Sequence, residues 1–332
     1  MTAAPKRPRL EGLERLPKRW RGGVVAIGNF DGVHRGHQAV LRAARAEAKR
    51  LAAPCLMLTF EPHPRAFFSG RPVFRLTPAP LKAALSAALG IEGTLVLPFS
   101  HGLAAMSAED FVRGILIGRL AIRAAVTGHD FHFGKARSGT PQFLAEQGKL
   151  NGFGVEIVEA LTESAAAVSA TRVRSALAQA DVATANRLLG WSFAVAGEVV
   201  RGDGRGRDLG YPTANMTLDK ASELAEGIYA VRFLGPDGVL RDGVASYGRR
   251  PMFGGGEPVL ETFVFDFSGD LYGQTALVAF HDFIRREERF ESVAALIARM
   301  DEDSLAARAA LERAPPGDLD RKLHAAWRDM HA

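Results

Sequence analysis

Cysteine is nearly absent from this sequence, since Cys55 is the only one among 332 residues. A single cysteine excludes an internal disulfide and a cysteine-rich zinc site. Cys55 lies within the apolar run 54–60, so we expect it to be a small buried side chain.

Long apolar runs are absent as well. No run approaches the ~20 residues that a helix needs to span a bilayer, and the longest candidate, residues 115–126, is interrupted by Arg119 and Arg123. The first 23 residues are basic but lack the apolar segment of a secretory signal. We therefore expect a cytoplasmic protein without a membrane segment, in which residues 1–23 form a disordered basic lead-in.

A strong excess of one charge is also missing, because 42 Lys and Arg residues stand against 37 Asp and Glu, a net charge of +5. This charge suits anionic small molecules and nucleic acid alike. Nucleic-acid-binding proteins interleave aromatic with basic residues, whereas the lead-in has only Trp20 and the other arginines are dispersed. Small anions are the favoured ligands, and a basic nucleic-acid-binding protein is the alternative from another functional class.

Short apolar segments alternate with helical stretches between residues 24 and 180. A cap of the type Ser-x-x-Asp, at Ser107 and Asp110, marks one helix start. Strands joined by helical crossovers are parallel, so the pattern predicts an α/β domain with a parallel, Rossmann-like sheet covered by helices. The expected strands are residues 24–28, 55–60, 95–99, 124–128 and 155–159.

After Gly190 the pattern changes to strands separated by short turns, which predicts an all-β barrel or sandwich with a terminal helix over residues 293–311. The expected strands are residues 193–200, 228–234, 239–246, 259–267 and 271–280, with hairpin turns at 236–238 and 268–270. We place the first domain at residues 24–185, the second at 186–315 and a C-terminal tail at 316–332.

The segment after the first expected strand reads GNFDGVHRGH, from Gly28 to His37. It opens a helix at the carboxyl end of a strand, where open α/β sheets bind ligands. The helix N-terminus offers unpaired N–H groups for a phosphate, and His34 and His37 add two donors. The glycines and Asp31 in the same turn favour a nucleotide site over a metal pair, for which no further ligand lies at an obvious spacing.

A second candidate phosphate contact is the segment SATRVR, from Ser169 to Arg174. Ser169 and Thr171 are N-cap residue types, and Val173 and Leu177 recur at helical spacing. Arg174 in the first turn could join the helix N–H groups around a phosphate. The alternative is an ordinary capped surface helix with an exposed arginine.

The segment GDGRGRDLGYPTAN, from Gly202 to Asn215, joins two strand-like segments. Its glycines permit close approach of the backbone to a ligand. No helix follows it and it lacks Gly-Lys-Ser/Thr, which excludes a Walker-type phosphate loop. A flexible hairpin loop is the alternative.

Glu261 is a lone carboxylate on an apolar strand face. Residues two apart share a face, and those at this spacing are Val259, Phe263, Phe265 and Phe267. A carboxylate there is costly unless it is paired, protonated or used in chemistry. The alternative is an edge strand with this face in solvent.

These motifs, in this order, resemble the bifunctional riboflavin kinase/FAD synthetase (FMN adenylyltransferase) family of bacteria. The resemblance extends from about residue 24 to residue 311 and includes TFEPHP at 59–64, GHDFHFG at 128–134 and FIRREERF at 283–290. It implies an enzyme that phosphorylates riboflavin to FMN and adenylylates FMN to FAD. ATP would be the co-substrate and Mg²⁺ the cofactor, the partners would be riboflavin, FMN and ATP, and we expect a monomer or a weak homo-oligomer.

In the first domain the resemblance implies catalytic roles for His34 and His37. It implies nucleotide contacts from Gly28, Phe30, Asp31, Gly36, Ser169, Thr171 and Arg174. It implies flavin contacts from Phe60, Pro62, His63, Asp130 and Phe133. Because the FMN phosphate is already ionised at neutral pH, its attack on the α-phosphorus of ATP needs alignment and charge stabilisation rather than a general base.

In the second domain the resemblance implies that Glu261 is the general base for the riboflavin 5′-hydroxyl. Thr213 and Asn215 would be Mg²⁺ ligands, and oxygen ligands suit this hard cation. Gly210 would contact the nucleotide and Arg285 the flavin.

Three residues depart from the family pattern, since Ala170, Ser246 and Met252 stand where the family usually has Ser, Asn and Thr. Ala170 removes one hydroxyl contact of the first domain, and the other two concern the kinase half. An alternative within enzymes is therefore a chain that retains one activity, with a weakened kinase.

Overall fold

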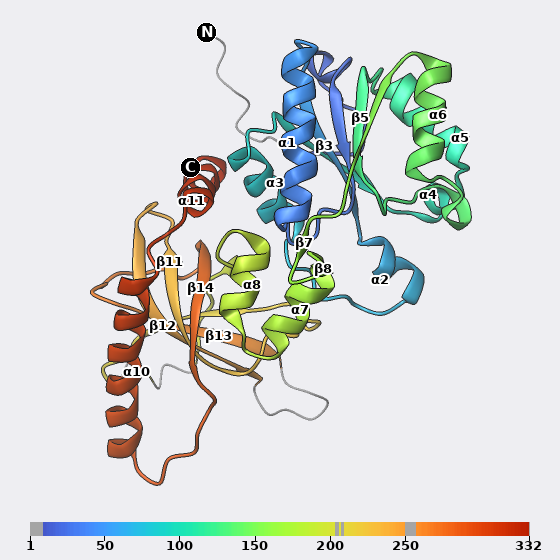
Figure 1. Cartoon of the computed structure of the whole chain (residues 1–332). Coiled ribbons are helices and arrows are strands. Elements are labelled where there is room, and N and C mark those ends of the chain that lie inside the picture. Colours follow the sequence, from blue (N-terminus) through green and yellow to red (C-terminus); the bar gives the residue numbers. More distant parts are fainter. Residues whose placement is uncertain (1–8, 203–205, 207–208, 250–256, 332) are drawn as a thin grey trace. The chain divides into compact units, whose positions relative to one another are not determined.

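Figure 1 shows the computed structural model, which describes residues 9–202, 206, 209–249 and 257–331. These residues divide into two compact units. Unit 1 contains residues 9–73 and 77–169, and unit 2 contains residues 74–76 and the described residues from 170 onward. The helices α7 (Ala170–Ala178) and α8 (Val182–Leu189) therefore pack in unit 2.

Unit 1 is built on a parallel six-stranded sheet in the order β1-β4-β3-β2-β5-β6. The predicted α/β fold is confirmed, and each of the five expected strands is present. The apolar runs of β2 to β5 are buried along almost their whole length, as expected for strands covered on both faces. The strands are β1 (Arg9–Glu11), β2 (Val24–Ile27), β3 (Cys55–Glu61), β4 (Gly93–Pro98), β5 (Ala124–Gly128) and β6 (Gly154–Val158).

Helices cover both faces of this sheet (Figure 1). One face carries α1 (Arg35–Arg50) and α3 (Ala79–Ala88), and the other carries η2 (Phe111–Arg119) and α6 (Pro141–Asn151), which share one apolar core with β2 to β5. The predicted cap is confirmed, because Asp110 N donates to Ser107 Oγ at 3.0 Å. The short elements are η1 (Lys18–Trp20), α2 (Pro64–Ser69), α4 (His101–Ala105), α5 (Ala108–Asp110), η3 (Lys135–Arg137), β7 (Thr162–Glu163) and β8 (Ala166–Ala167).

The predicted disorder of the lead-in is wrong for residues 9–23. Here β1 adds a strand beside β4, and Trp20 is only 3% exposed. Leu10 and Leu16 pack against the same core as Trp20. A Cβ on Gly93 would lie 2.3 Å from the indole ring, so glycine at that position lets Trp20 lie against the sheet. The basic residues of this segment surround an apolar set that is sufficient to order it.

Unit 2 is a nearly closed antiparallel barrel of six strands in the order β10-β13-β12-β11-β14-β9. The predicted all-β barrel is confirmed, and a bridge between Val200 and Asn215 brings β9 beside β10. The sequence pattern does not predict β10, whose first three residues lie in the expected loop. The strands are β9 (Ala194–Glu198), β10 (Thr213–Thr217), β11 (Gly227–Leu234), β12 (Leu240–Arg249), β13 (Pro258–Val264) and β14 (Thr275–Arg285).

The two predicted hairpin turns have different outcomes. Residues 236–238 connect β11 to β12, which pair as an antiparallel hairpin. Residues 268–270 connect β13 to β14, but β14 pairs with β11 and β9 instead. The second prediction is wrong because turn composition indicates a local reversal of the chain and not which strands pair.

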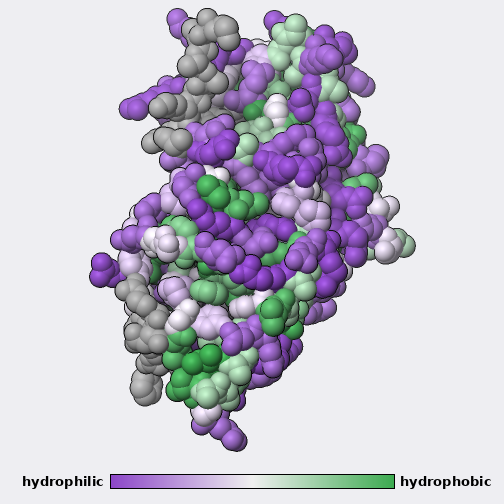
Figure 2. Space-filling model, turned by 90° about the vertical axis from the view of Figure 1, so that its left-hand side faces the viewer, coloured by the Kyte–Doolittle hydropathy of each residue, from purple (hydrophilic) through white to green (hydrophobic). Residues whose placement is uncertain are grey.

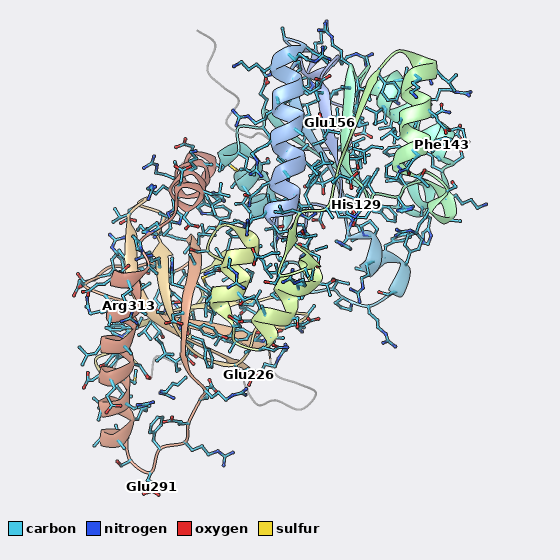
Figure 3. The ribbon with its side chains drawn as sticks, viewed as in Figure 1. His129, Phe143, Glu156, Glu226, Glu291 and Arg313 are labelled. Carbon is cyan, nitrogen blue, oxygen red and sulfur yellow. The ribbon has the colours of Figure 1, made fainter. Side chains whose placement is uncertain are left out.

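The predicted terminal helix is confirmed as α10 (Val293–Arg313). Ala307, Ala310 and Leu311 of this helix pack in one apolar cluster with residues of β11 and β12. Figure 3 shows Glu291 at the end of the loop that precedes α10 and Arg313 at the other end of the helix.

The predicted C-terminal tail is instead a second terminal helix, α11 (Asp318–His331). Leu323 and Trp327 lie four residues apart on it, and both are buried. The buried Asp320 accepts a hydrogen bond from Ser192 N at 2.8 Å. The high charge of this segment conceals an apolar stripe and one polar anchor, which together attach the helix to unit 2.

Within the ranges that the structure describes, none of the helices has both the length and the apolar character that a bilayer crossing requires. Figure 2 shows a face on which hydrophilic residues predominate and hydrophobic residues form separate patches. The most exposed large apolar side chains, Leu150 and Leu305, belong to different units.

Candidate functional site

The first candidate site lies where the strand order of unit 1 reverses. From the central β2 the chain proceeds to β3 and β4 on one side, and later to β5 and β6 on the other. Open α/β sheets bind ligands at such a switch point, beyond the carboxyl ends of the strands. A cavity of about 870 Å³ lies there and is lined by residues at or beyond the carboxyl ends of β2, β3, β4 and β5. It brings together the predicted residues Gly28, Phe30, His37, Phe60, His63, Asp130 and Phe133.

Seven residues predicted for the first domain do not line the cavity, and three of them, Ser169, Thr171 and Arg174, are described below. Asp31 is buried, and its Oδ1 accepts a hydrogen bond from Thr77 N at 3.1 Å. A Cβ on Gly36 would lie 3.2 Å from the His34 ring, and His34 itself is the N-cap of α1. Pro62 is exposed at the end of β3. Asp31, His34 and Gly36 thus shape the loop whose first residues, 28–30, line the cavity.

The loop between β2 and α1 holds unusual backbone angles. Phe30 and Val33 have φ values of 48° and 39°, which bulky and β-branched residues rarely adopt. Both side chains are fully buried, and Gly32 N donates to Thr77 Oγ1 at 2.8 Å. Burial and this hydrogen bond hold the loop in its strained conformation. Strain maintained in this way is concentrated at functional sites.

His34 and His37 form a stacked pair at the start of α1, with ring centroids 3.6 Å apart. His37 N donates to His34 Nδ1 at 3.3 Å, so a neutral His34 ring carries its proton on Nε2. Burial, and then the nearby His34 and Lys82, hold the pKa of His37 well below its ordinary value of 6.5. The His37 ring can therefore offer a neutral N–H donor at pH 7.

The Nδ1 atom of His37 is enclosed and has no hydrogen-bond partner among residues that the structure describes. Buried polar atoms in native structures are almost always hydrogen-bonded, so each exception needs an explanation. Because His37 lines the cavity, a bound ligand is the natural partner for this ring.

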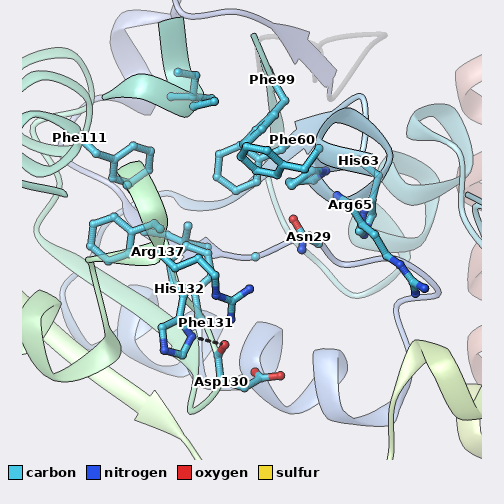
Figure 4. A pocket seen from close by; sticks show the side chains of 18 of the residues that line it. Asn29, Phe60, His63, Arg65, Phe99, Phe111, Asp130, Phe131, His132 and Arg137 are labelled. Atoms are coloured by element: carbon cyan, nitrogen blue, oxygen red, sulfur yellow. Dashed lines mark hydrogen bonds between the residues drawn. The ribbon is translucent and has the colours of Figure 1, made fainter. Parts of the chain in front are cut away.

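Aromatic side chains form one wall of the cavity and polar side chains another. The rings of Phe60 and Phe99 meet edge to face at 6.0 Å. Figure 4 shows Asp130 and Arg137 opposite them, with the Asn29 side chain between the two groups. This arrangement suits a flat ring system that carries an anionic group.

Two buried polar residues near this cavity are not predicted from the sequence. Lys82 of α3 is 2% exposed, and Thr77 is 1% exposed. The signal for Lys82 is a single charge among the buried residues Leu81, Ala83 and Ala84. Thr77 carries no local signal, because its hydrogen bonds join it to a loop 45 and 46 residues away in sequence.

Ser169 ends unit 1, and α7 of unit 2 begins at the next residue. Thr171 is exposed on this helix. Arg174 is only 9% exposed, and its Nε donates to Phe74 O at 2.7 Å. The alternative of an ordinary surface helix with an exposed arginine is therefore wrong.

The second candidate site is a cavity of about 370 Å³ in unit 2. It lies between the barrel and α10, because Leu296, Met300 and Asp303 of that helix also line it. It brings together the predicted residues Thr213, Glu261 and Arg285. The other two predicted residues, Gly210 and Asn215, do not line it.

The strand register places Glu261 between Asn215 of β10 and Ser246 of β12. Directly paired residues of antiparallel strands share a face, so three polar side chains form a row across the sheet. Phe263 follows Glu261 along the strand and lines the same cavity. The predicted apolar surroundings of Glu261 are therefore confirmed for its neighbour on the same strand but wrong for its neighbours on the adjacent strands. The alternative of an edge strand is also wrong, because β13 lies between β10 and β12.

Asn215 fits the expectation of a metal ligand. Its side chain is 5% exposed, and its Oδ1 has no hydrogen-bond partner in the described part of the chain. Its Nδ2 donates to Thr213 O at 3.4 Å, which leaves the amide oxygen for a hard cation such as Mg²⁺. Gly210, three residues before the start of β10, has a φ of 86°, a conformation that glycine adopts without strain.

Arg285 and Tyr211 are both anchored by α10. Nε and Nη2 of Arg285 donate to the two carboxylate oxygens of Asp303 at 2.8 and 2.6 Å. The Tyr211 hydroxyl donates to Asp301, and its ring lies 4.8 Å from that of Phe263. Burial, and then the Asp301 hydrogen bond, raise the pKa of Tyr211 to about 12. Tyr211 and Asp303 also line the cavity, and only the packing of α10 reveals them.

The three departures from the family pattern lie in different surroundings. Ser246 lines the second cavity, and its hydroxyl donates to Glu287 at 3.3 Å. Ala170 is the first residue of α7. Met252 lies outside the described residues.

Two family models match this chain, one described as FAD synthetase over residues 16–172 and one as riboflavin kinase over residues 189–311. A bifunctional riboflavin kinase/FMN adenylyltransferase of Pseudomonas fluorescens is 41% identical over 301 residues, covering 90% of this chain and 96% of the relative. Its counterpart in Escherichia coli K12 is 37% identical over 300 residues, covering 90% and 95%.

A solved structure, described as a macrolide-efflux protein from Streptococcus pneumoniae, has the same fold over most of both chains. The TM-score is 0.79 at 29% sequence identity, and the match covers 90% of this chain and 98% of the other.

Proposed function

The chain belongs to the bifunctional riboflavin kinase/FMN adenylyltransferase family, and on that premise we propose how its residues divide the two reactions. It phosphorylates riboflavin to FMN and adenylylates FMN to FAD, with ATP as the second substrate of both steps. Because the matches cover both halves, neither the single-activity alternative nor the nucleic-acid-binding alternative is favoured.

The assignment of adenylyl transfer to unit 1 rests on the stacked histidine pair at the switch point of its sheet. An FMN phosphate oxygen attacks the α-phosphorus of ATP, and pyrophosphate leaves. His34 and His37 donate hydrogen bonds to the phosphoryl oxygens as charge develops there. The N-terminus of α1 adds N–H groups and positive potential.

The remaining predicted residues of this half are proposed as binding contacts. The flavin binds between the aromatic and polar walls of the cavity. Its proposed contacts are Phe60, Pro62, His63, Asp130 and Phe133. The proposed nucleotide contacts in unit 1 are Gly28, Phe30, Asp31, Gly36 and Ser169. Thr171 and Arg174 of α7 stay the nucleotide contacts that the family resemblance implies.

The assignment of the kinase reaction to the cavity of unit 2 rests on Glu261. Its carboxylate accepts the proton of the riboflavin 5′-hydroxyl as that oxygen attacks the γ-phosphorus of ATP. Thr213 and Asn215 would hold Mg²⁺, which would neutralise part of the phosphate charge. Arg285, fixed by Asp303, contacts the flavin, and Gly210 allows the backbone to approach the nucleotide.

Each cavity is lined by residues of one unit of one chain. We therefore propose that a monomer carries out both reactions, with at most weak self-association. We propose functional domains at residues 24–185 and 186–315, although α7 and α8 pack in unit 2. Since both reactions consume ATP, we place the enzyme in the cytoplasm.

Replacement of His37 by Ala separates the two activities. FAD formation from FMN should fall by about 10²–10³, the usual effect of removing one donor to transition-state charge. FMN formation from riboflavin should stay normal, and His101→Ala, at an exposed histidine of the same unit, should change neither rate. Products are separated by chromatography. Equal loss of both activities in His37→Ala would contradict the division of labour, and an undiminished FAD rate would remove His37 from the mechanism.

A metal titration tests the Mg²⁺ assignment. Chelation with EDTA should stop both reactions, and added Mg²⁺ should restore them. Asn215→Ala should raise the Mg²⁺ concentration that half-saturates the kinase reaction, because it removes one oxygen ligand. The Mg²⁺ dependence of FAD formation from FMN should not change. An unaltered Mg²⁺ dependence of the kinase would show that Asn215 is not a ligand.

A further inference from the structure

Lys82 is a buried lysine that neither reaction uses in the assignments above. It lies on α3, is 2% exposed, and does not line the cavity of unit 1. Burial of an ammonium group is costly unless oxygen acceptors surround it. The groups that Lys82 contacts should therefore explain why a lysine occupies this buried position.

Three oxygens surround the Lys82 ammonium. Its Nζ lies 3.0 Å from Asn29 O, 3.2 Å from Thr59 Oγ1 and 3.4 Å from Glu61 Oε1. An ammonium has three N–H donors and no acceptor, and each of these oxygens can accept one of its hydrogen bonds. They join α3 to the loop after β2 and to the last residues of β3, which are two of the chain segments that form the cavity.

The contact with Asn29 leads directly to the strained loop. Asn29 lines the cavity, and the next residue, Phe30, has the positive φ described above. Thr59 Oγ1 also donates to Asn29 O at 2.9 Å. Two donors thus hold one carbonyl at the point where the chain leaves β2 and enters the histidine motif.

We infer that Lys82 is a positioning residue for FMN adenylylation, which holds the Asn29 carbonyl and so sets the conformation of the loop that carries His34 and His37. This inference rests on the assignment of adenylyl transfer to the cavity of unit 1. Lys82 acts through alignment of the reacting groups, and a misplacement of about 1 Å can reduce a rate by about 10². The proximity of its charge to His37, which favours the neutral ring, agrees with this role.

The test is Lys82→Met in the full chain, because Met keeps the length of the side chain and removes the ammonium. The expected result is a fall of about 10–10² in kcat for FAD formation from FMN, with smaller changes in KM for ATP and FMN. The kinase activity of the same molecules should stay within twofold of the wild-type rate and calibrates the enzyme concentration. A kcat within twofold of wild type, measured below the melting temperature, would overturn the inference.

Ser86→Ala is the matched control. Ser86 lies one turn further along α3, is 1% exposed, and its hydroxyl contacts Thr94 Oγ1 of β4 at 2.7 Å instead of the motif loop. It should change stability without changing kcat for adenylylation. If Ser86→Ala reduced kcat as much as Lys82→Met, the effect would belong to the packing of α3, and the inference would fail.

A second variant covers the case in which Lys82→Met does not fold. The double replacement Lys82→Met/Glu61→Gln leaves no uncompensated carboxylate beside the methionine, so it should melt closer to wild type. Its adenylylation kcat should remain low, whereas Glu61→Gln alone should retain most of the activity. Recovery of kcat in the double variant would reduce Lys82 to a counter-ion of Glu61 and overturn the inference. His37→Ala tests separately whether adenylyl transfer takes place in this cavity. If FAD formation did not fall in that variant, the assignment of the reaction to the cavity would be wrong, whatever the result for Lys82→Met.

Discussion

At the scale of single residues, Glu261 shows how a side chain acquires its role from its neighbours. It lies on an interior strand with Asn215 and Ser246 beside it and Phe263 along the strand. The two paired neighbours are polar, and Phe263 lines the same cavity as Glu261. A partly enclosed carboxylate of this kind is suited to accept a proton from a bound hydroxyl.

Glu261→Gln should reduce riboflavin phosphorylation by about 10²–10⁴, because glutamine keeps the shape but cannot accept the hydroxyl proton. FAD synthesis from supplied FMN should continue at its normal rate. The measurement is a pair of initial rates, with riboflavin and with FMN, together with a thermal melt. A kinase rate near wild type would exclude Glu261 as the base, and a much lower melting temperature would identify it as a structural carboxylate.

Cys55 should be inert toward thiol reagents in the folded protein. It is 3% exposed at the start of β3, and burial, followed by the nearby Glu92, raises the pKa of its thiol to about 12. Since the thiolate is the reactive form, a colorimetric thiol assay should show no fast reaction in buffer. The same assay in denaturant should show one thiol per chain. Rapid labelling of the native protein would contradict the packing of β3.

At the scale of elements, the N-terminal segment is ordered by its apolar residues in spite of its basic composition. The indole of Trp20 occupies the space that a side chain at position 93 would fill. The short strand β1 alone could not hold this segment, because three residues bury too little surface. Packing of Trp20 against the sheet therefore provides most of the attachment.

Trp20→Ala should lower the free energy of unfolding of unit 1 by about 3–5 kcal/mol, the usual effect of truncating a large buried aromatic residue. Urea denaturation, followed by loss of FAD formation, would measure it. Arg19→Ala, at the exposed neighbouring position, should leave stability within about 0.5 kcal/mol. A change of the same small size for Trp20→Ala would show that residues 9–23 contribute little to the fold.

At the scale of the whole molecule, stability should decline in mild acid through a polar group of unit 2 that neither reaction uses. Burial, and then the charge of Arg232, lower the pKa of His281 from 6.5 to about 4. Between these two pH values the unfolded chain binds a proton that the folded protein does not bind, so stability falls as the pH falls. One pKa unit corresponds to ~1.4 kcal/mol, which limits the loss at pH 4 to about 3 kcal/mol.

His281→Gln should flatten this pH dependence, because glutamine does not titrate and can still accept a hydrogen bond from Arg232. Thermal melts of unit 2 between pH 7 and pH 4, with loss of kinase activity as the marker, would measure the change. His101→Gln, at an exposed histidine of unit 1, should follow the wild-type curve. Identical curves for the wild type and His281→Gln would show that other groups control the acid sensitivity.

The sequence predicts most strands of both sheets and the part of the first site that is continuous in the chain. Residues 28–37 carry their own signal, because a strand end, glycines and two histidines follow one another within ten residues. Lys82 and Thr77 carry almost none, since each is defined by partners that are distant in the chain. The hairpin predicted at residues 268–270 is wrong for the same reason, because strand pairing is a long-range property.

The sequence by itself determined the two fold classes, the motif order and the family, because periodicity, turn residues and short motifs are properties of neighbouring residues. The tertiary structure alone decided which residues surround each cavity. Register placed Asn215 and Ser246 on either side of Glu261, and the packing of α3 and α10 brought Lys82 beneath the histidine loop and Asp303 to Arg285. These contacts depend on the closure of sheets over long stretches of chain, which no local pattern encodes.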